Sequence, residues 1–236
     1  MEKYGNNENA FRVVVCSLIG MLLIGWICCI SVNAAELDAS FKTDFYSKYV
    51  WRGFNLCDEA VIQPSLTIGK APVSLNIWGS LNGEDQARCH ELDYTLDYAF
   101  QVGKLPANIG YIYYTFPNLS AGDKTQEVYA GITAPGKYPL TLKLFHDYDE
   151  GRGTYCELAG SFPIPAGKQA LAASVALGYN NHQWRESSGL SHAQVTLSTE
   201  FKTSWAVLAP IVGYSAALHH DFRDEAFYGV SVTPKW

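Results

Sequence analysis

From about residue 40 onward, polar and apolar side chains alternate with a period of two, and helical periodicity is almost absent. The clearest case is residues 91–102, where Glu91, Asp93 and Asp97 share one parity and large apolar residues take the other. Residues 192–201 repeat the pattern. Such alternation predicts strands with one polar and one apolar face. The sequence therefore indicates an all-β chain.

Twelve alternating segments can be marked, each of about ten residues, which is the length of a tilted transmembrane strand. Short Gly-, Pro- and Lys-containing connections alternate with longer polar ones. We therefore expect an up-and-down antiparallel transmembrane β-barrel of about 12 strands. A soluble barrel or sandwich is the structural alternative, because it would bury the apolar face instead. The expected strands are 41–52, 60–69, 73–81, 91–102, 107–116, 125–133, 139–148, 154–163, 170–180, 192–201, 205–215 and 227–236.

The start of the chain reads as a secretory signal. A polar stretch carrying Lys3 and Arg12 precedes an apolar run over residues 13–30, and small residues around Ala34 follow it. We expect cleavage after Ala34, which leaves residues 35–236 as the barrel domain. The alternative is an uncleaved anchor, since a run of about 18 residues is long enough to span a bilayer.

Aromatic residues should gather where the apolar face meets the two membrane interfaces. The last segment alternates up to a terminal tryptophan, which resembles the assembly signal of bacterial outer-membrane proteins. It implies periplasmic chaperones, the barrel insertion machinery and outer-membrane lipid as partners, and the outer membrane of a Gram-negative bacterium as the location. The interface candidates are Trp51, Phe100, Phe201, Trp205 and Trp236.

The opposite parity would line the lumen with charges of both signs. A dozen strands can enclose a narrow aqueous lumen, so we expect a porin that passively admits small hydrophilic solutes or ions. The alternative is that the charges pair across the interior and leave a plugged structural or surface-interaction barrel. The pore-lining candidates are Lys42, Asp44, Lys48, Arg52, Glu91, Asp93, Asp97, Lys143, Glu157 and Glu200, and Glu127 and Asp147 share their parity.

Other function classes find less support. The net charge of −6 argues against a nucleic-acid partner, which would need a basic face. A lipid hydrolase at the barrel rim would need a Ser-His-acid constellation, and the loop histidines form no pattern typical of one. Asp147, Asp149 and Glu150 lack the spacing of a calcium loop, and residues 219–221 read as exposed loop. We therefore assign no catalytic residue, metal or cofactor.

Three cysteines follow the predicted cleavage site. Cys57 and Cys89 fall in loops on the same outer side, an oxidising compartment in which disulfides persist. We expect them to pair, whereas Cys156 would be a small apolar residue. The alternatives are a bridge from Cys156 to either of the other two, or three free thiols.

The opening of the first strand carries a family resemblance. Residues 45–53 read Phe-Tyr-Ser-Lys-Tyr-Val-Trp-Arg-Gly, and Gln-Pro-Ser-Leu follows at 63–66. This stretch resembles the TorF-type family of predicted Gram-negative porins, catalogued as of unknown function. The resemblance implies an outer-membrane barrel and a pore, and it supplies no substrate or catalytic residue.

Overall fold

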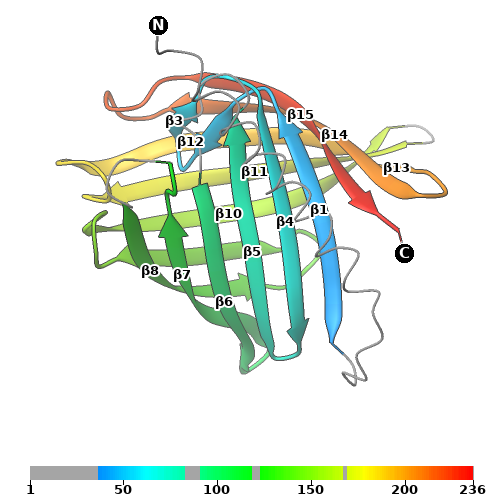
Figure 1. Ribbon diagram of the computed structural model, residues 1–236, viewed down its shortest axis with the longest axis horizontal. Coiled ribbons are helices and arrows are strands. Elements are labelled where there is room, and N and C mark those ends of the chain that lie inside the picture. Colours follow the sequence, from blue (N-terminus) through cyan, green and yellow to red (C-terminus); the bar gives the residue numbers. More distant parts are fainter. Residues whose placement is uncertain (1–36, 83–90, 119–122, 167–168, 236) are drawn as a thin grey trace, which may run out of the picture. The chain divides into compact units, whose positions relative to one another are not determined.

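The computed structural model describes residues 37–82, 91–118, 123–166 and 169–235. In these residues a dozen strands run antiparallel around a closed barrel, each paired with its neighbours in chain order (Figure 1). The first strand pairs with the last, and this contact joins the two ends of the chain's sheet. The barrel strands are β1 (Asp38–Tyr46), β4 (Val61–Lys70), β5 (Val73–Asn82), β6 (Glu91–Val102), β7 (Leu105–Thr115), β8 (Lys124–Ala134), β9 (Leu140–Asp147), β10 (Gly153–Ala166), β11 (Gln169–Asn181), β12 (Ser188–Thr199), β14 (Ala206–Ala217) and β15 (Glu225–Pro234).

A short strand, β13 (Phe201–Lys202), pairs with β14 on the same side as β12, so it extends the position of β12 in the wall. The remaining strands, β2 (Tyr49–Trp51) and β3 (Phe54–Cys57), form a separate two-stranded hairpin. The all-β barrel expected from the alternation is confirmed.

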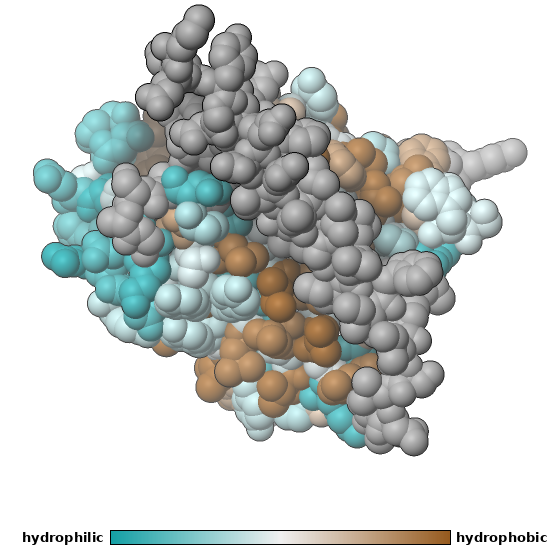
Figure 2. Space-filling model, viewed as in Figure 1, coloured by the Kyte–Doolittle hydropathy of each residue, from teal (hydrophilic) through white to brown (hydrophobic). Residues whose placement is uncertain are grey.

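The two faces of the wall have the predicted polarity. On β6, Leu96 is 50% exposed on the outside, whereas Glu91 on the inward parity is only 9% exposed. Large apolar side chains are exposed along the outward parity of the strands, and a patch of apolar residues lies in the lower middle of the space-filling view (Figure 2). Exposing so many large apolar residues would be costly in water, so this surface fits a lipid environment and not that of a soluble sandwich.

The connections divide the barrel into two ends. At the short-turn end, tight turns such as that between β4 and β5 join the strands, at the bottom of Figure 1. At the long-loop end, longer segments follow β1, β5, β7, β9, β11 and β14. The β2–β3 hairpin belongs to the first of these long segments and lies at the upper rim in Figure 1.

The first expected strand, 41–52, is wrong at its carboxyl end. The wall strand β1 stops at Tyr46, and the chain leaves the wall before the hairpin begins at Tyr49. The hairpin turns at Arg52 and Gly53, with φ of 51° and 87°. Positive φ at both central residues is typical of a two-residue turn whose twist matches that of its strands. Lys48 and Arg52 therefore lie outside the barrel wall.

Two tryptophans show how the inner space is filled. Trp51 lies on the hairpin and packs on the inward-facing Tyr114 at 6.2 Å between ring centroids, so its assignment to the membrane interface is wrong. Trp78 of β5 also points inward, where it packs on Tyr49 with 5.6 Å between the ring centroids. Both rings stabilise the hairpin inside the barrel by apolar burial.

No helix in the described part of the chain is long and apolar enough to cross a bilayer. The apolar run at 13–30, the predicted cleavage after Ala34, Cys89 and Trp236 lie outside the described residues.

Candidate functional site: a hairpin held inside the lumen

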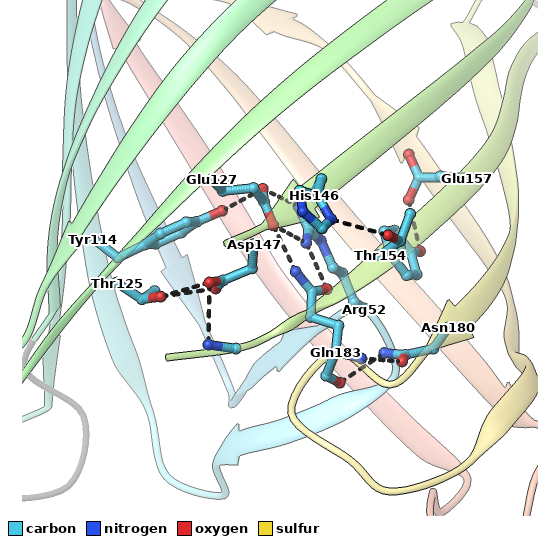
Figure 3. A network of polar contacts seen from close by, with 12 residues as sticks. Arg52, Tyr114, Thr125, Glu127, His146, Asp147, Thr154, Glu157, Asn180 and Gln183 are labelled. Atoms are coloured by element: carbon cyan, nitrogen blue, oxygen red, sulfur yellow. Dashed lines mark hydrogen bonds and ion pairs between the residues drawn. The ribbon is translucent and has the colours of Figure 1, made fainter. Parts of the chain in front are cut away.

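The turn of the β2–β3 hairpin is tied to the far wall by Arg52. Its guanidinium forms a two-pronged ion pair with Glu127 of β8, with Nη1 to Oε2 at 2.7 Å and Nη2 to Oε1 at 2.8 Å (Figure 3). Nη1 also donates to Oε1 of Gln183, in the segment between β11 and β12, at 2.8 Å. Glu127 is 0% exposed. The charge pair is thus desolvated, and paired geometry of this kind is among the stronger polar contacts.

Aromatic rings enclose the same guanidinium. Its central carbon lies 4.1 Å from the ring centroid of Phe145, 4.5 Å from Trp51 and 4.7 Å from Tyr155. Ring faces attract a cation at these distances. Burial is the largest influence on the pKa of the Arg52 guanidinium and lowers it, but the hydrogen bonds to Glu127, the charge of Glu127 and the nearby Tyr114 and Tyr155 together raise that pKa above its usual value. Arg52 therefore stays charged inside the barrel.

Gly53 brings the turn close to β12. A Cβ atom at this position would lie 3.0 Å from Nδ1 of His192, so a side chain would press on that ring. Glycine also accepts the positive φ without strain. The turn of the hairpin thus lies beside β12 as well as beside Glu127 of β8.

Further hydrogen bonds satisfy the carboxylates around the tie (Figure 3). Tyr114 donates to Glu127 at 3.0 Å, and Gln183 donates to it at 2.6 Å. Asp147 of β9 accepts from Thr125 at 2.8 Å and from the backbone amide of Gly151 at 3.1 Å. A buried polar network with its members paired in this way is rigid.

The base of the hairpin is anchored separately. The ammonium of Lys48 lies 2.7 Å from Glu225 of β15 and 2.7 Å from Asp58. Hydrogen bonds to Asp58 and Glu225 raise the pKa of Lys48, and the same contact with Lys48 lowers the pKa of Asp58. Tyr49, Cys57 and Val61 form the buried apolar cluster beneath.

The short-turn half of the lumen is hollow and lined by smaller side chains. One cavity there measures about 400 Å³ and is bounded by inward residues of β9 to β12, including Glu157, Ser174 and Thr196. A second, of about 310 Å³, lies against β1 and β4 to β6 and includes Thr67 and Asp97. The inner space is therefore narrowed at the long-loop end and open toward the other.

The remaining pore-lining candidates, apart from Glu200, lie at inward positions of the wall strands. Lys42 pairs with Asp44 at 2.8 Å on β1. Asp97 accepts from Asn108 at 2.6 Å and also from Tyr129. Lys143 lies 5.4 Å from the ring centroid of Tyr129. Glu157 accepts from Tyr155 at 3.2 Å, and Glu200 lies exposed between β12 and β13, 3.9 Å from Lys202.

Glu91 and Asp93 are inward carboxylates with which no described residue forms an ion pair. Both are buried on β6, and Oδ1 of Asp93 has no hydrogen-bond partner. The parity of the strand predicts that both side chains point inward. Only the structure shows that the Arg52 guanidinium pairs with Glu127 and not with either of them.

A further cavity, of about 640 Å³, opens at the long-loop end between the hairpin and the wall. Aromatic and charged residues line it, and we call it the mouth pocket. Its lining consists of Trp51, Phe54, Leu56, Glu91, Tyr114, Phe116, Asp123, Lys124, Thr125, Asp149, Glu150 and Trp184.

The cysteines and surface aromatics have the following places. Cys57 is disulfide-bonded and Cys156 is a free thiol. The partner expected for Cys57 lies outside the described residues, so that pairing stays a prediction. Phe100, Phe201 and Trp205 are exposed toward the short-turn end, with Trp205 59% exposed, and their place at the membrane interface stays a prediction.

His219, His220 and Asp221 gather in the segment between β14 and β15, with one potential metal-ligand atom from each within 4.8 Å of the others. The guanidinium of Arg185 already contacts Asp221 at 2.8 Å and His219 at 2.8 Å. A positive charge there competes with a metal ion for the same atoms.

Residues 33–227 match the profile of Gcw_chp, described as a bacterial protein of unknown function. The chain belongs to the Gcw_chp family. This match does not carry the TorF-type name that the opening motif suggested, so the finer resemblance stays a prediction. No curated protein sequence matches this Gcw_chp chain.

Several solved outer-membrane proteins are similar in shape to this Gcw_chp protein. The COG4313 outer membrane channel from Pseudomonas putida F1 is 11% identical over 85% of this chain and 96% of that chain, with a TM-score of 0.47. OccD1 (OprD) is 8% identical over 86% of this chain and 66% of that chain, with a TM-score of 0.41. OmpT of Vibrio cholerae is 11% identical over 88% of this chain and 99% of that chain, with a TM-score of 0.39. Likeness at this level transfers no function, and the strand pairing of the chain itself establishes the barrel.

Proposed function

We propose that this Gcw_chp protein is an outer-membrane channel whose conductance is limited by its own first long loop. The barrel would passively admit ions or small hydrophilic solutes in the outer membrane of a Gram-negative bacterium. The observation that carries the proposal is the Arg52–Glu127 tie, which holds the β2–β3 hairpin inside a lumen that is otherwise polar and partly hollow. Loops folded into a barrel restrict or plug it.

The polar lining supports a channel more than a purely structural barrel. Inward side chains of the short-turn half are mostly small and hydrophilic, and they border two cavities. A barrel built only for rigidity would be better served by a filled interior. Inward carboxylates outnumber inward Lys and Arg side chains, and this should favour the passage of cations, because rings of charge set the selectivity of a pore.

Planar-bilayer recordings of the mature full-length chain test this proposal. We expect small stepwise conductance from the wild type, and larger steps when residues 49–57 are replaced by a Gly-Ser linker of equal length. The control replaces residues 135–137, an exposed turn between β8 and β9 at the short-turn end, and should leave the step size near that of the wild type.

Two outcomes would overturn the channel. If both the wild type and the linker variant form heat-modifiable barrels that never conduct, the barrel is a plugged structural or surface-interaction protein. If such silent barrels also cleave ester substrates in a way that survives a change of detergent, the rim hydrolase is the better assignment.

A further inference from the structure

The mouth pocket is built from two independent parts of the chain. The hairpin supplies Trp51, Phe54 and Leu56 on one side, and the starts or ends of β6, β7 and β8 supply much of the other. Its volume of about 640 Å³ lies within the usual range for small-molecule sites. Because the ion pair of Arg52 with Glu127 fixes the hairpin, the side of the pocket that the hairpin forms is preformed.

The walls of the mouth pocket are aromatic. Trp51 stacks on Phe54 with centroids 6.3 Å apart and meets Tyr114 edge-on at 6.2 Å. Trp184, from the segment between β11 and β12, lines the same cavity and is 45% exposed. Ring faces gathered around one space attract cations through their negative quadrupoles, most strongly when the cation carries apolar substituents that shed water easily.

The charged residues of the mouth pocket also favour a cation. Four carboxylates line it against the single ammonium of Lys124, which lies 5.9 Å from the ring centroid of Tyr113. Glu91 is the buried member of this group, and it has no ion pair in the described chain. An ionised carboxylate that is buried without a countercharge is unfavourable, so a cation entering the pocket would be stabilised beside it. The four carboxylates are Glu91, Asp123, Asp149 and Glu150.

We propose that the mouth pocket binds a small organic cation, an ammonium carrying apolar or aromatic substituents. The ammonium would lie near Glu91 and the rings of Trp51 and Trp184 would face its substituents. Carboxylates repel anions, and a neutral solute gains no ionic attraction from Glu91, so the pocket discriminates by charge as well as shape. The inference goes beyond the proposed channel, since binding at the mouth requires no conduction.

The test measures equilibrium binding to the full-length protein in neutral detergent. Binding is measured by calorimetry, with empty micelles as the blank. Benzyltrimethylammonium is the probe, and benzyl alcohol and benzenesulfonate are its neutral and anionic counterparts. We expect the cation to bind at least roughly tenfold more tightly than either counterpart, which corresponds to one well-placed cation–π or ionic contact.

Two pocket variants have matched controls elsewhere on the barrel. Glu91→Gln keeps the size of the side chain and removes its charge, and Trp184→Leu removes a ring from an exposed segment. Each should weaken binding of the cation by roughly tenfold. The controls Glu200→Gln and Trp205→Leu alter an exposed carboxylate and an exposed ring at the short-turn end, and should change binding less than twofold.

Equal binding of benzyl alcohol and the cation, or unchanged cation binding in both pocket variants, would overturn the proposal. Tight binding of maltose without binding of the cation would make the pocket a carbohydrate site and overturn it as well. Heat-modifiability of each variant on gels shows that the barrel has formed. Because conductance is measured separately, a silent barrel that binds the cation refutes the channel alone.

Discussion

Replacing Arg52 by alanine should free the β2–β3 hairpin from the wall while the barrel itself stays assembled. The change removes three hydrogen bonds of 2.7–2.8 Å and leaves Glu127, which is 0% exposed, without its countercharge. Removing one partner of a buried ion pair costs roughly 3–5 kcal/mol. Because no strand of the wall contains Arg52, the loss of this free energy should destabilise the docked position of the hairpin and not the barrel wall.

The magnitude sets the expected readout. Since about 1.4 kcal/mol is a tenfold change in an equilibrium constant, the docked population should fall relative to the undocked one by about a hundredfold to a few thousandfold. Single-channel recordings should then show larger or longer openings than the wild type. Arg223→Ala removes an exposed arginine from a long loop and is the matched control, with openings like those of the wild type.

A double-mutant cycle separates the pair from general loss of packing. Glu127→Ala should be as disruptive as Arg52→Ala, because it leaves the guanidinium unpaired. The double variant should cost less than the sum of the single ones, with a coupling above roughly 1.5 kcal/mol. Additive effects, together with unchanged conductance in Arg52→Ala, would show that this pair does not hold the hairpin.

Three further predictions concern selectivity, covalent structure and processing. Asp93→Asn combined with Asp97→Asn should move the reversal potential in a salt gradient toward anions, because two inward carboxylates are lost; an unmoved potential would place both away from the constriction. Peptide mapping without reductant should yield a linked peptide joining Cys57 and Cys89, whereas complete alkylation of both would remove the bridge. Amino-terminal sequencing should begin at Ala35, with a heat-dependent gel shift in the outer-membrane fraction; a start at Met1 in the inner membrane contradicts the cleaved signal.

Much of the barrel could be predicted from the residues alone, because the period of two is a local property. Each strand of the wall has lipid on one side and the lumen on the other, so its inward and outward residues differ in every pair. This is why the parity of Glu91, Asp93 and Leu96 on β6 agrees with the burial of their side chains. The alternation of short and long connections likewise carried over, since it needs only chain order.

The hairpin could not be predicted, because its strand continues the alternation of β1. Tyr49, Trp51 and Arg52 read as the end of a wall strand, and nothing local marks the departure of the chain from the wall after Tyr46. The partners that settle the matter are distant in sequence: Glu127 lies 75 residues from Arg52, and Gln183 lies 131 residues from it.

Local sequence therefore determined which side of each wall strand meets lipid, because that choice depends only on neighbouring residues along one strand. Tertiary structure alone decided what fills the lumen, because a charge is stable there only beside a partner brought from another strand. Arg52 has such a partner in Glu127, whereas neither Glu91 nor Asp93 forms an ion pair with a described residue. No pattern along the chain shows which inward charges have an ion-pair partner. In the folded protein, the Arg52–Glu127 pair holds the hairpin that narrows the lumen, and the mouth pocket beside it is acidic.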